Sequence, residues 1–534
     1  MLKVKNRDNL YFEGMDPWEN KLSAKKLALL QKSWAEVFRK HILPMMPIRH
    51  VAKYFDKEQG RPSKEVVSTC GACVLQQIFD LTDSETIDQL AFNEQWHYAV
   101  DVLDQDDQIL CLKTLWNMRH ILTTDKVAKE IFNKATDKLK EVYQVDTGLQ
   151  RLDSVHIHSN MARLGRVRLL ARVCTKFLIN LKRQDKELYE LVSSSLKSRY
   201  EKDKDSSYFG NAKPSESQKR LINIAQDMYE LICQFKAHAP INSLYSYKEL
   251  ERVFFEHCSI EDENVVVKSN KDISSESLQN PSDPDATYDG HKGQGYQVQI
   301  METYCREPSE DDDSASLQLI TYVDVEPAHC HDSKALEPAL QETEKRGMLP
   351  SELEADSHYG SRDNKKKTKE LGVDLVAPLP GNKPKNNLVN FEFDPKTHEV
   401  KRCPEGHAPT KIKHNKKGTM TAIWSHDDCG SCALFSSCAV QKAKKGYRLL
   451  YNHNEAQAAL HRRYEQGQEF KEKYRYRAGI EATNSRYIHM TRARRMRYRG
   501  LTRIDYAARL KALGINMFRT AKYMAMNLDN PCYA

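Results

Sequence analysis

Three acidic residues stand in sequence contexts that suit metal-dependent phosphodiester chemistry. Asp153 lies in a mostly apolar stretch, Asp356 follows another and precedes Gly360, which allows a tight turn, and Glu481 lies in a helical segment. Phosphodiester transfer needs two divalent cations, about 4 Å apart, that hold the attacking and leaving oxygens. Because hard cations such as Mg²⁺ or Mn²⁺ prefer carboxylate oxygens, we predict that these three acids bind two such ions and are the catalytic residues.

The surrounding sequence predicts the elements that must position these acids. Alternation of apolar and polar residues, or a short apolar run, predicts five strands at 149–160, 296–301, 317–323, 349–355 and 373–377. A helix is predicted over 332–345, where Asp332 and Ser333 can cap its start. Apart from a long helical insertion after the first strand, this is the order of a ribonuclease-H-like domain. Its first and fourth strands are neighbours, so acidic residues on them can share metal ions.

The expected fold class is therefore mixed α/β, with a ribonuclease-H-like core that is interrupted twice. Residues 9–15, Asn-Leu-Tyr-Phe-Glu-Gly-Met, resemble an altered viral-protease cleavage site followed by a start methionine. The predicted parts are a tag remnant at 1–14, a helical DNA-binding or dimerisation domain at 15–145, the first part of the core at 146–160 and 285–381, a helical insertion and loop at 161–284, a Cys-rich insertion at 382–453, and a C-terminal helical part of the core at 454–534 that carries Glu481.

Basic and aromatic residues near Glu481 are typical of a DNA-binding surface. Tyr474, Arg477 and Glu481 are spaced i, i+3, i+7, so they share one helix face. Arginine can bind a phosphate through two N–H groups, and a tyrosine ring can stack on an unpaired base. The net charge is only +8, but arginines crowd residues 475–503, while an acidic run occupies 310–313. A solvated helix surface is the alternative interpretation of this basic stretch.

These motifs resemble those of bacterial insertion-sequence DDE transposases with a Tyr-x2-Arg-x3-Glu-x6-Lys signature. Tyr474, Arg477 and Glu481 match its first three places, and Ile488 stands at the Lys place, near which His489, Arg492 and Arg495 are predicted to bind DNA. Further similar stretches are 278–286 (Leu-Gln-Asn-Pro-Ser-Asp-Pro-Asp-Ala), 290–296 (Gly-His-Lys-Gly-Gln-Gly-Tyr), His331-Asp332 and 355–360 (Ala-Asp-Ser-His-Tyr-Gly). At the first acid, Asp153-Ser154-Val155 departs from the usual Asp-Gly-Thr.

The resemblance implies a function and partners. It implies Mg²⁺-dependent endonuclease cleavage at the terminal inverted repeats of a transposon, followed by attack of the freed 3′ hydroxyl on target DNA. No covalent protein–DNA intermediate is expected. The implied partners are double-stranded DNA, both at the transposon ends and in the target, and a second copy of the chain, because both ends must be held at once.

A cluster of cysteines gives a second candidate metal site. Cys429, Cys432 and Cys438 follow Cys403 at a distance, and the Cys-x2-Cys spacing is typical of a zinc ribbon. His407 is a competing ligand. We therefore predict a structural zinc ion at these four cysteines, with reduced, metal-free thiols as the alternative.

Other patterns predict different functions or were set aside. His156-Ile157-His158 matches the His-hydrophobe-His pair with which some single-strand nucleases hold a metal beside a nucleophilic tyrosine. A transposase-derived DNA-binding protein without catalysis is a further alternative, favoured by Ser154 and Ile488. The remaining acids in or near the predicted core were set aside as structural or solvated, namely Asp146, Asp324, Asp332 and Asp374.

Composition excludes some classes of protein. With 40% apolar and 29% charged residues, most of the chain is expected to fold rather than stay disordered. No apolar run of about 18 residues predicts a membrane span, and no signal peptide is recognised. We therefore expect a cytoplasmic, nucleoid-associated protein in which the 13 cysteines are reduced or bind metal.

Overall fold

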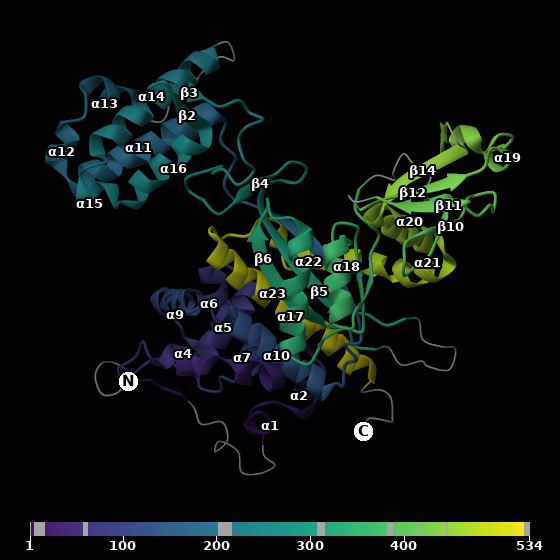
Figure 1. Cartoon of the computed structure of the whole chain (residues 1–534). Helices are drawn as coiled ribbons and strands as arrows, with labels where there is room; N and C mark the ends of the chain where they lie inside the picture. The colour runs from purple at the N-terminus through teal and green to yellow at the C-terminus, as the bar shows by residue number, and fades with distance from the viewer. Residues whose placement is uncertain are drawn as a thin grey trace.

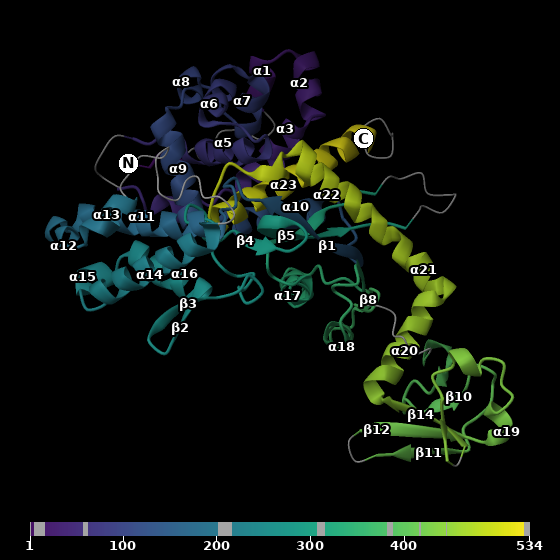
Figure 2. The same cartoon turned by 90° about the horizontal axis from the view of Figure 1, so that it is seen from above.

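The computed structural model describes residues 2–4, 16–56, 62–200, 216–306, 316–381, 388–415, 418–444 and 446–527. The acidic run at 310–313 and most of the predicted tag remnant lie outside the described residues. A central sheet with its helices is flanked by a helical unit on one side and by a small β-rich unit on the other (Figures 1 and 2). The prediction of a mixed α/β fold is confirmed.

The central sheet brings together strands from two distant parts of the chain. Its six strands are β1 (Leu149–His158), β4 (Thr287–Asp289), β5 (Gly293–Thr303), β6 (Ile320–Pro327), β7 (Glu352–Ala355) and β8 (Asp374–Val376). They are ordered β4-β5-β1-β7-β8, and β6 pairs with β5. The β1–β7 and β7–β8 pairs are parallel, whereas β5 is antiparallel to β1, β4 and β6. Strand β4, in a segment predicted to be loop, was not expected.

Both faces of the sheet are buried, although strict alternation of apolar and polar residues would leave one face in solvent. On one face Leu152 and Leu353 pack with α17 (Leu336–Lys345). On the other face Val155 and Ile300 belong to a larger core that includes the C-terminal helix α23 (Leu501–Asn527). Because side chains alternate along a strand, Asp153 lies on the same side of β1 as Val155, the side that faces α23.

The N-terminal helices complete this larger core. Their buried residues join those of the sheet and of α23 in one hydrophobic cluster, and Leu2 packs against it. The carbonyl of Lys3 also accepts a hydrogen bond from Val66 N, at 3.1 Å. The helices are α1 (Pro17–Lys21), α2 (Ala24–Gln31), α3 (Trp34–Val37), α4 (Ile48–Ala52), α5 (Val66–Ile78), α6 (Asp83–Phe92), α7 (Glu94–Val100), α8 (Gln105–Gln108), α9 (Leu112–Thr124) and α10 (Ala128–Val142).

The segment between β1 and β4 forms the helical unit, which has a core of its own. Its elements are α11 (Arg166–Gln184), α12 (Lys186–Glu190), α13 (Ser194–Tyr200), α14 (Ser217–Phe235), α15 (Ala239–Asn242), α16 (Tyr245–His257), β2 (Cys258–Glu261) and β3 (Asn264–Val267). The hairpin of β2 and β3 occupies part of the predicted loop, where Val265 and Val267 pack against this core. None of the described helices is both long and apolar enough to cross a membrane.

The segment between β8 and the C-terminal helices forms the β-rich unit, with α20 and α21 leading back to the core (Figure 2). Its elements are β9 (Glu392–Phe393), β10 (Val400–Arg402), β11 (Lys411–His414), β12 (Thr419–Trp424), α19 (His426–Cys429), η6 (Phe435–Ser437), β13 (Gln441–Ala443), β14 (Gly446–Asn452), α20 (His453–Gln466) and α21 (Gln468–Tyr474). Strands β11, β12, β14 and β13 form a sheet in this order. Trp424 and Tyr451 are fully buried in the unit's small core.

A buried ion pair holds the helix of Glu481 against the sheet. Arg151 of β1 donates from Nε to Glu302 Oε1 of β5 at 2.7 Å, and Glu302 is fully buried. The same guanidinium donates from Nη1 to the carbonyl of Tyr476 at 2.8 Å, just before α22 (Gly479–Met490). From α22 itself, Thr483 Oγ1 donates to Glu302 Oε2 at 2.7 Å. This network therefore ties α22 to β1 and β5.

The start of α22 leaves room for this guanidinium only because residue 479 is glycine. A Cβ atom on Gly479 would lie 2.0 Å from Arg151 Nη1, an impossible contact. Arg151 is 7% exposed and is held by Glu302 and by the Tyr476 carbonyl, so it cannot swing aside without losing these hydrogen bonds.

We expect Gly479→Ala to lower the free energy of unfolding by about 1–3 kcal/mol, the usual effect of overpacking a buried site. Chemical denaturation of the full chain measures this change. Gly290→Ala is the matched control, because a Cβ atom there meets nothing within 4 Å. Equal stability of the two variants would contradict the tight packing of α22 on Arg151.

Candidate active site

The sheet brings Asp153 and Asp356 to equivalent positions on neighbouring parallel strands. Leu152 of β1 is paired with Ala355 of β7, and each acid is the next residue along its chain. Asp153 is 9% exposed, and the Asp356 side chain is 24% exposed. The two carboxylates that were predicted on the first and fourth strands therefore lie side by side, at the point where β7 ends beside the middle of β1.

Arg477 links the third predicted acid to this pair. Its Nη2 lies 3.4 Å from Asp153 Oδ2, and its Nη1 lies 3.3 Å from Glu481 Oε1. Asn484, one turn beyond Glu481 on α22, donates from Nδ2 to Asp153 Oδ2 at 3.1 Å. The Glu481 side chain is 66% exposed. The structure thus brings α22 onto Asp153, with a guanidinium between Asp153 and Glu481. Sequence analysis did not single out Asn484, which shares the Glu481 helix face at i, i+3.

A fourth acid, Asp332, which sequence analysis set aside, lies beside Asp356. It begins the 3-10 turn η4 (Asp332–Lys334), shortly after β6. His358 Nδ1 lies 3.5 Å from Asp332 Oδ2 and 3.5 Å from Asp356 Oδ2. Gln299 of β5 donates from Nε2 to Asp332 Oδ1 at 3.2 Å. The His331-Asp332 pair at a helix start was the available signal for this position.

The surroundings of Asp153 disfavour its ionised form. Burial is the main cause that raises the pKa of Asp153 to about 6, and the nearby Asp356 and Asp332 raise it further. Arg477 and the backbone N–H of Ser154 lower it, but only in part. A divalent cation would oppose this effect, because a nearby positive charge favours the ionised carboxylate.

The donor set fits the oxygen chemistry that Mg²⁺ prefers, since Asp153, Asp356 and Asp332 are neighbouring carboxylates. Burial of Asp153 beside two other carboxylates disfavours its ionised form, which is the reason to expect a cation there. As placed, however, no three His, Cys, Asp or Glu side chains of the described residues form a group closed enough to hold a metal ion. At this point of the structure the Arg477 guanidinium supplies the positive charge.

The residues predicted to bind DNA are spread over α21, α22 and the 3-10 turns next to α22: Tyr474 ends α21, and Arg477 lies in η7 (Arg475–Ala478), so the single helix predicted through Tyr474, Arg477 and Glu481 is interrupted. Tyr474 stacks on Phe470, with ring centroids 5.3 Å apart, and burial raises its pKa. His489, Arg492 and Arg495 are exposed, and Arg495 ends the 3-10 turn η8 (Ala493–Arg495). Ile488, at the Lys place of the signature, packs against the large core.

The other acids set aside in the sequence have structural partners. Asp324 Oδ1 lies 2.7 Å from Arg509 Nη2, and Asp374 Oδ2 lies 2.8 Å from Lys473 Nζ. Asp146 Oδ1 accepts a hydrogen bond from Gly148 N at 2.8 Å.

The His156 and His158 rings contact each other on β1, with centroids 4.8 Å apart. Burial lowers the pKa of His156 to about 4, so its ring is neutral at neutral pH. Within the described ranges this pair has no third metal ligand beside it.

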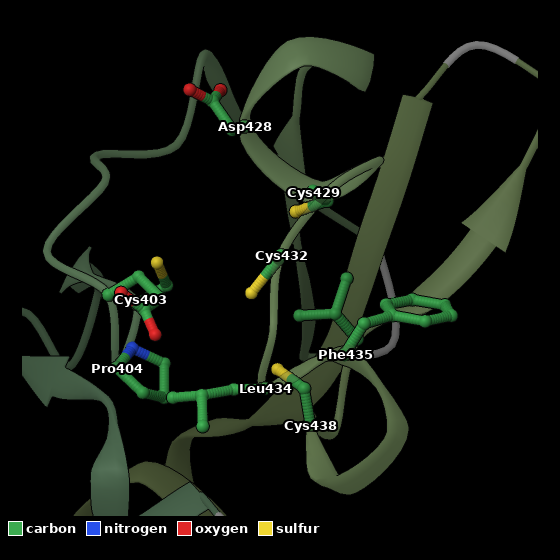
Figure 3. Close-up of a pocket in the computed structure, with 10 residues that line it drawn as sticks. Cys403, Pro404, Asp428, Cys429, Cys432, Leu434, Phe435 and Cys438 are labelled. Carbon is green, nitrogen blue, oxygen red and sulfur yellow. The ribbon is translucent and has the colours of Figure 1, made fainter.

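The four cysteines singled out in the sequence lie together in the β-rich unit. Figure 3 shows the sulfur atoms of Cys403, Cys429, Cys432 and Cys438 pointing toward one another across a pocket. These four, like the other cysteines that the structure describes, are free thiols. The cluster is therefore separate from the carboxylate site on the central sheet.

The raised pKa of Asp153 predicts a change in stability. The folded pKa of about 6 lies above the ordinary value of 3.8, so the folded state binds more protons and loses stability as pH rises through this interval. Above pH 6 the ionised Asp153 carboxylate lowers the free energy of unfolding by about 1–3 kcal/mol. We therefore expect Asp153→Asn to stabilise the protein by up to this amount at pH 7 in EDTA, measured by chemical denaturation.

Glu481→Gln is the matched control for this measurement. Its side chain is 66% exposed, so we expect a change within about 0.5 kcal/mol. An Asp153→Asn protein that is less stable than the wild type at pH 7 would contradict the unfavourable charge assigned to this residue.

Two family models match parts of the chain. One is described as a transposase DDE domain and matches residues 402–521, which include the four cysteines and Glu481 but neither Asp153 nor Asp356. The other is described as a transposase domain (DUF772) and matches residues 28–120 in the N-terminal helices. Comparison with curated proteins and with solved structures gave no match. Both matching models are transposase models, and they support a transposase of the insertion-sequence type.

Proposed function

We propose that the protein is a DDE transposase that cuts DNA at transposon ends and joins the freed 3′ ends to target DNA. Asp153, Asp356 and Glu481 are its catalytic carboxylates. The observation that carries this proposal is the adjacent position of Asp153, within β1, and Asp356, directly after β7, with α22 attached to Asp153 through Arg477 and Asn484. The two transposase matches favour the same function.

The strand order supports a ribonuclease-H-like core for this enzyme. If the short strand β4 is left out of the numbering, the first strand, β1, lies between the second, β5, and the fourth, β7. The second strand is antiparallel to the first, and the fourth and fifth are parallel to it. The helical unit after β1 and the β-rich unit after β8 are then insertions into this core.

The chemistry requires the acids to hold divalent cations. Two bound Mg²⁺ or Mn²⁺ ions would activate the attacking oxygen and stabilise the leaving one. Asp153 and Asp356 would hold them from the sheet, and Glu481 from α22. Arg477 already lies between Asp153 and Glu481, and its N–H groups can instead bind a DNA phosphate, to which arginine is well suited. If Arg477 leaves the two carboxylates to bind a phosphate, Asp153 and Glu481 become able to bind the cations.

The proposed substrate is double-stranded DNA at the terminal inverted repeats and in the target. The exposed His489, Arg492 and Arg495 extend from the end of α22 and would bind the backbone near the cut. Tyr474 lies on the same side as Arg477 and would contact a base or sugar. A homodimer is proposed because two transposon ends must be processed together.

Two alternatives predict different experiments. A His-hydrophobe-His nuclease would form a covalent tyrosyl–DNA adduct and lose activity at His156, and the transposase DDE match does not favour it. A non-catalytic DNA-binding protein would bind the terminal repeats but would not cut them with any divalent cation. The non-catalytic alternative is favoured by Ile488, a hydrophobic residue at the place where the signature has Lys.

We expect Asp153→Asn, Asp356→Asn and Glu481→Gln each to lower strand cleavage by about 1000-fold. Loss of a metal ligand removes several kcal/mol of transition-state stabilisation, and each 1.4 kcal/mol is about tenfold in rate. The assay uses the full chain, Mg²⁺ or Mn²⁺, and duplex DNA that carries the inverted repeats flanking the gene. Mobility shift of the same duplex should be unchanged.

Asp374→Asn is the matched control, since Asp374 is an acid of the same sheet that pairs with Lys473. It should cleave at the wild-type rate. Cleavage retained in any one of the three variants would remove that residue from the active site, and the absence of cleavage by the wild type with either cation would favour the non-catalytic alternative.

We expect Asp332→Asn to raise the Mg²⁺ concentration needed for half-maximal cleavage by about tenfold. Asp332 lies beside Asp356, with His358 Nδ1 3.5 Å from both carboxylates, and loss of a residue next to a metal ligand typically lowers metal affinity by about 10–100-fold. A Mg²⁺ titration separates this effect from a loss of maximal rate. An unchanged Mg²⁺ dependence would show that Asp332 does not support the site.

A further inference from the structure

Four cysteines from three separate turns of the β-rich unit line one pocket. Cys403 follows β10, Cys429 ends α19 with Cys432 just beyond it, and Cys438 follows η6. Their sulfur atoms point toward one another (Figure 3). Cys429 is 9% exposed, and the other three are partly buried. Four inward-pointing thiols from separate turns are the ligand arrangement of a structural zinc site.

The remaining wall of the pocket offers mainly hydrocarbon. Pro404, Leu434, Phe435 and Val440 line it together with the cysteines. The two acidic residues of the lining are Glu405 and Asp428, and Asp428 already has partners. Ser425 Oγ donates to Asp428 Oδ2 at 2.6 Å, and in Figure 3 the Asp428 carboxylate lies away from the sulfur atoms.

His407, which the sequence offered as an alternative zinc ligand, contacts Asp428 outside the pocket. Its Nδ1 lies 3.4 Å from Asp428 Oδ1, and its side chain is 48% exposed. Its backbone carbonyl accepts from Cys403 N at 2.9 Å, which closes the turn that carries Cys403. His407 therefore shapes this turn while the four thiols face the pocket, and the geometry favours a ligand set of four cysteines over one of three cysteines and a histidine.

The β-rich unit is of the kind that a bound metal ion often stabilises. Its hydrophobic core is small, and Leu434 and Phe435, between the cysteines, remain 40% and 38% exposed. Units below about 70–80 residues rarely reach high stability from a hydrophobic core alone and are often stabilised by a metal ion or by disulfides. A metal ion at the four thiols would tie the turns after β10, α19 and η6 together.

We propose that Cys403, Cys429, Cys432 and Cys438 bind one structural zinc ion as thiolates. All four positions of a tetrahedral ion are then taken by protein, so the site has no place for a substrate. As placed, the sulfur atoms do not form a closed metal group, and binding draws them to about 2.3 Å from the ion. This site is independent of the proposed transposase chemistry.

Zinc analysis of the full-length wild-type protein, purified without chelators, tests the proposal. We expect elemental mass spectrometry to give one zinc per chain. We expect the X-ray absorption spectrum at the zinc edge to show only sulfur in the first coordination shell, at about 2.3 Å from the zinc. Both measurements use folded wild-type protein, so they do not depend on how well a cysteine variant folds. Protein without zinc, iron in its place, or nitrogen in the first shell would overturn the assignment.

Single substitutions identify the ligands. Cys429→Ser and Cys432→Ser should each lower the zinc content at least about tenfold, because each removes one of four thiolates. Cys305→Ser is the matched control, an exposed cysteine elsewhere in the chain that should retain one zinc. His407→Ala should also retain it. Zinc lost with His407→Ala but kept with Cys432→Ser would overturn the four-cysteine ligand set.

Discussion

The buried pair of Arg151 and Glu302 is the interaction on which the candidate site depends most. It joins two strands of the sheet and, through the Tyr476 carbonyl and Thr483, the start of α22. Glu302 also pairs with Arg519, whose Nη1 lies 2.8 Å from Glu302 Oε2, so removal of Glu302 would leave two arginines without this carboxylate. Loss of one partner from a buried ion pair typically costs about 3–5 kcal/mol. The network therefore fixes where α22 meets β1. This network therefore also sets the distances from Asp153 to three residues that do not contact Glu302 themselves, namely Arg477, Glu481 and Asn484.

A second constraint comes from the acids themselves. Asp153 is buried next to Asp356 and Asp332, so its negative charge is unfavourable in the absence of a cation. Arg509 and Lys473 neutralise Asp324 and Asp374 elsewhere on the sheet. At the candidate site, Arg477 is divided between two carboxylates at distances above 3 Å. Asp324 and Asp374 thus have a close cationic partner, whereas Asp153 has only long contacts to a guanidinium that it shares with Glu481.

Sequence analysis predicted the strands of the central sheet that alternate or are apolar, and with them the positions of Asp153 and Asp356. It missed the strands of the β-rich unit because they are short and rich in lysine, as in Lys411–His414. Asp332 was set aside because its distance to Asp356 depends on how the turn after β6 folds back, which no local pattern encodes. The Arg151–Glu302 pair was missed for a related reason, since a buried ion pair interrupts the apolar periodicity that identifies a strand.

The position of Arg477 explains why α22 can approach the sheet before any metal is bound. Without a positive charge between them, Asp153 and Glu481 would repel, and this repulsion would oppose the contacts that hold α22 against the sheet, namely the network around Glu302 and the hydrogen bond from Asn484 to Asp153. The guanidinium offsets this repulsion with long contacts of 3.3 and 3.4 Å, which are weaker than a close bidentate pair. Weak contacts are also the ones most easily exchanged for a phosphate and a divalent cation. Under the proposed function, the same residue would therefore stabilise the metal-free fold and release the two acids when DNA and cations bind.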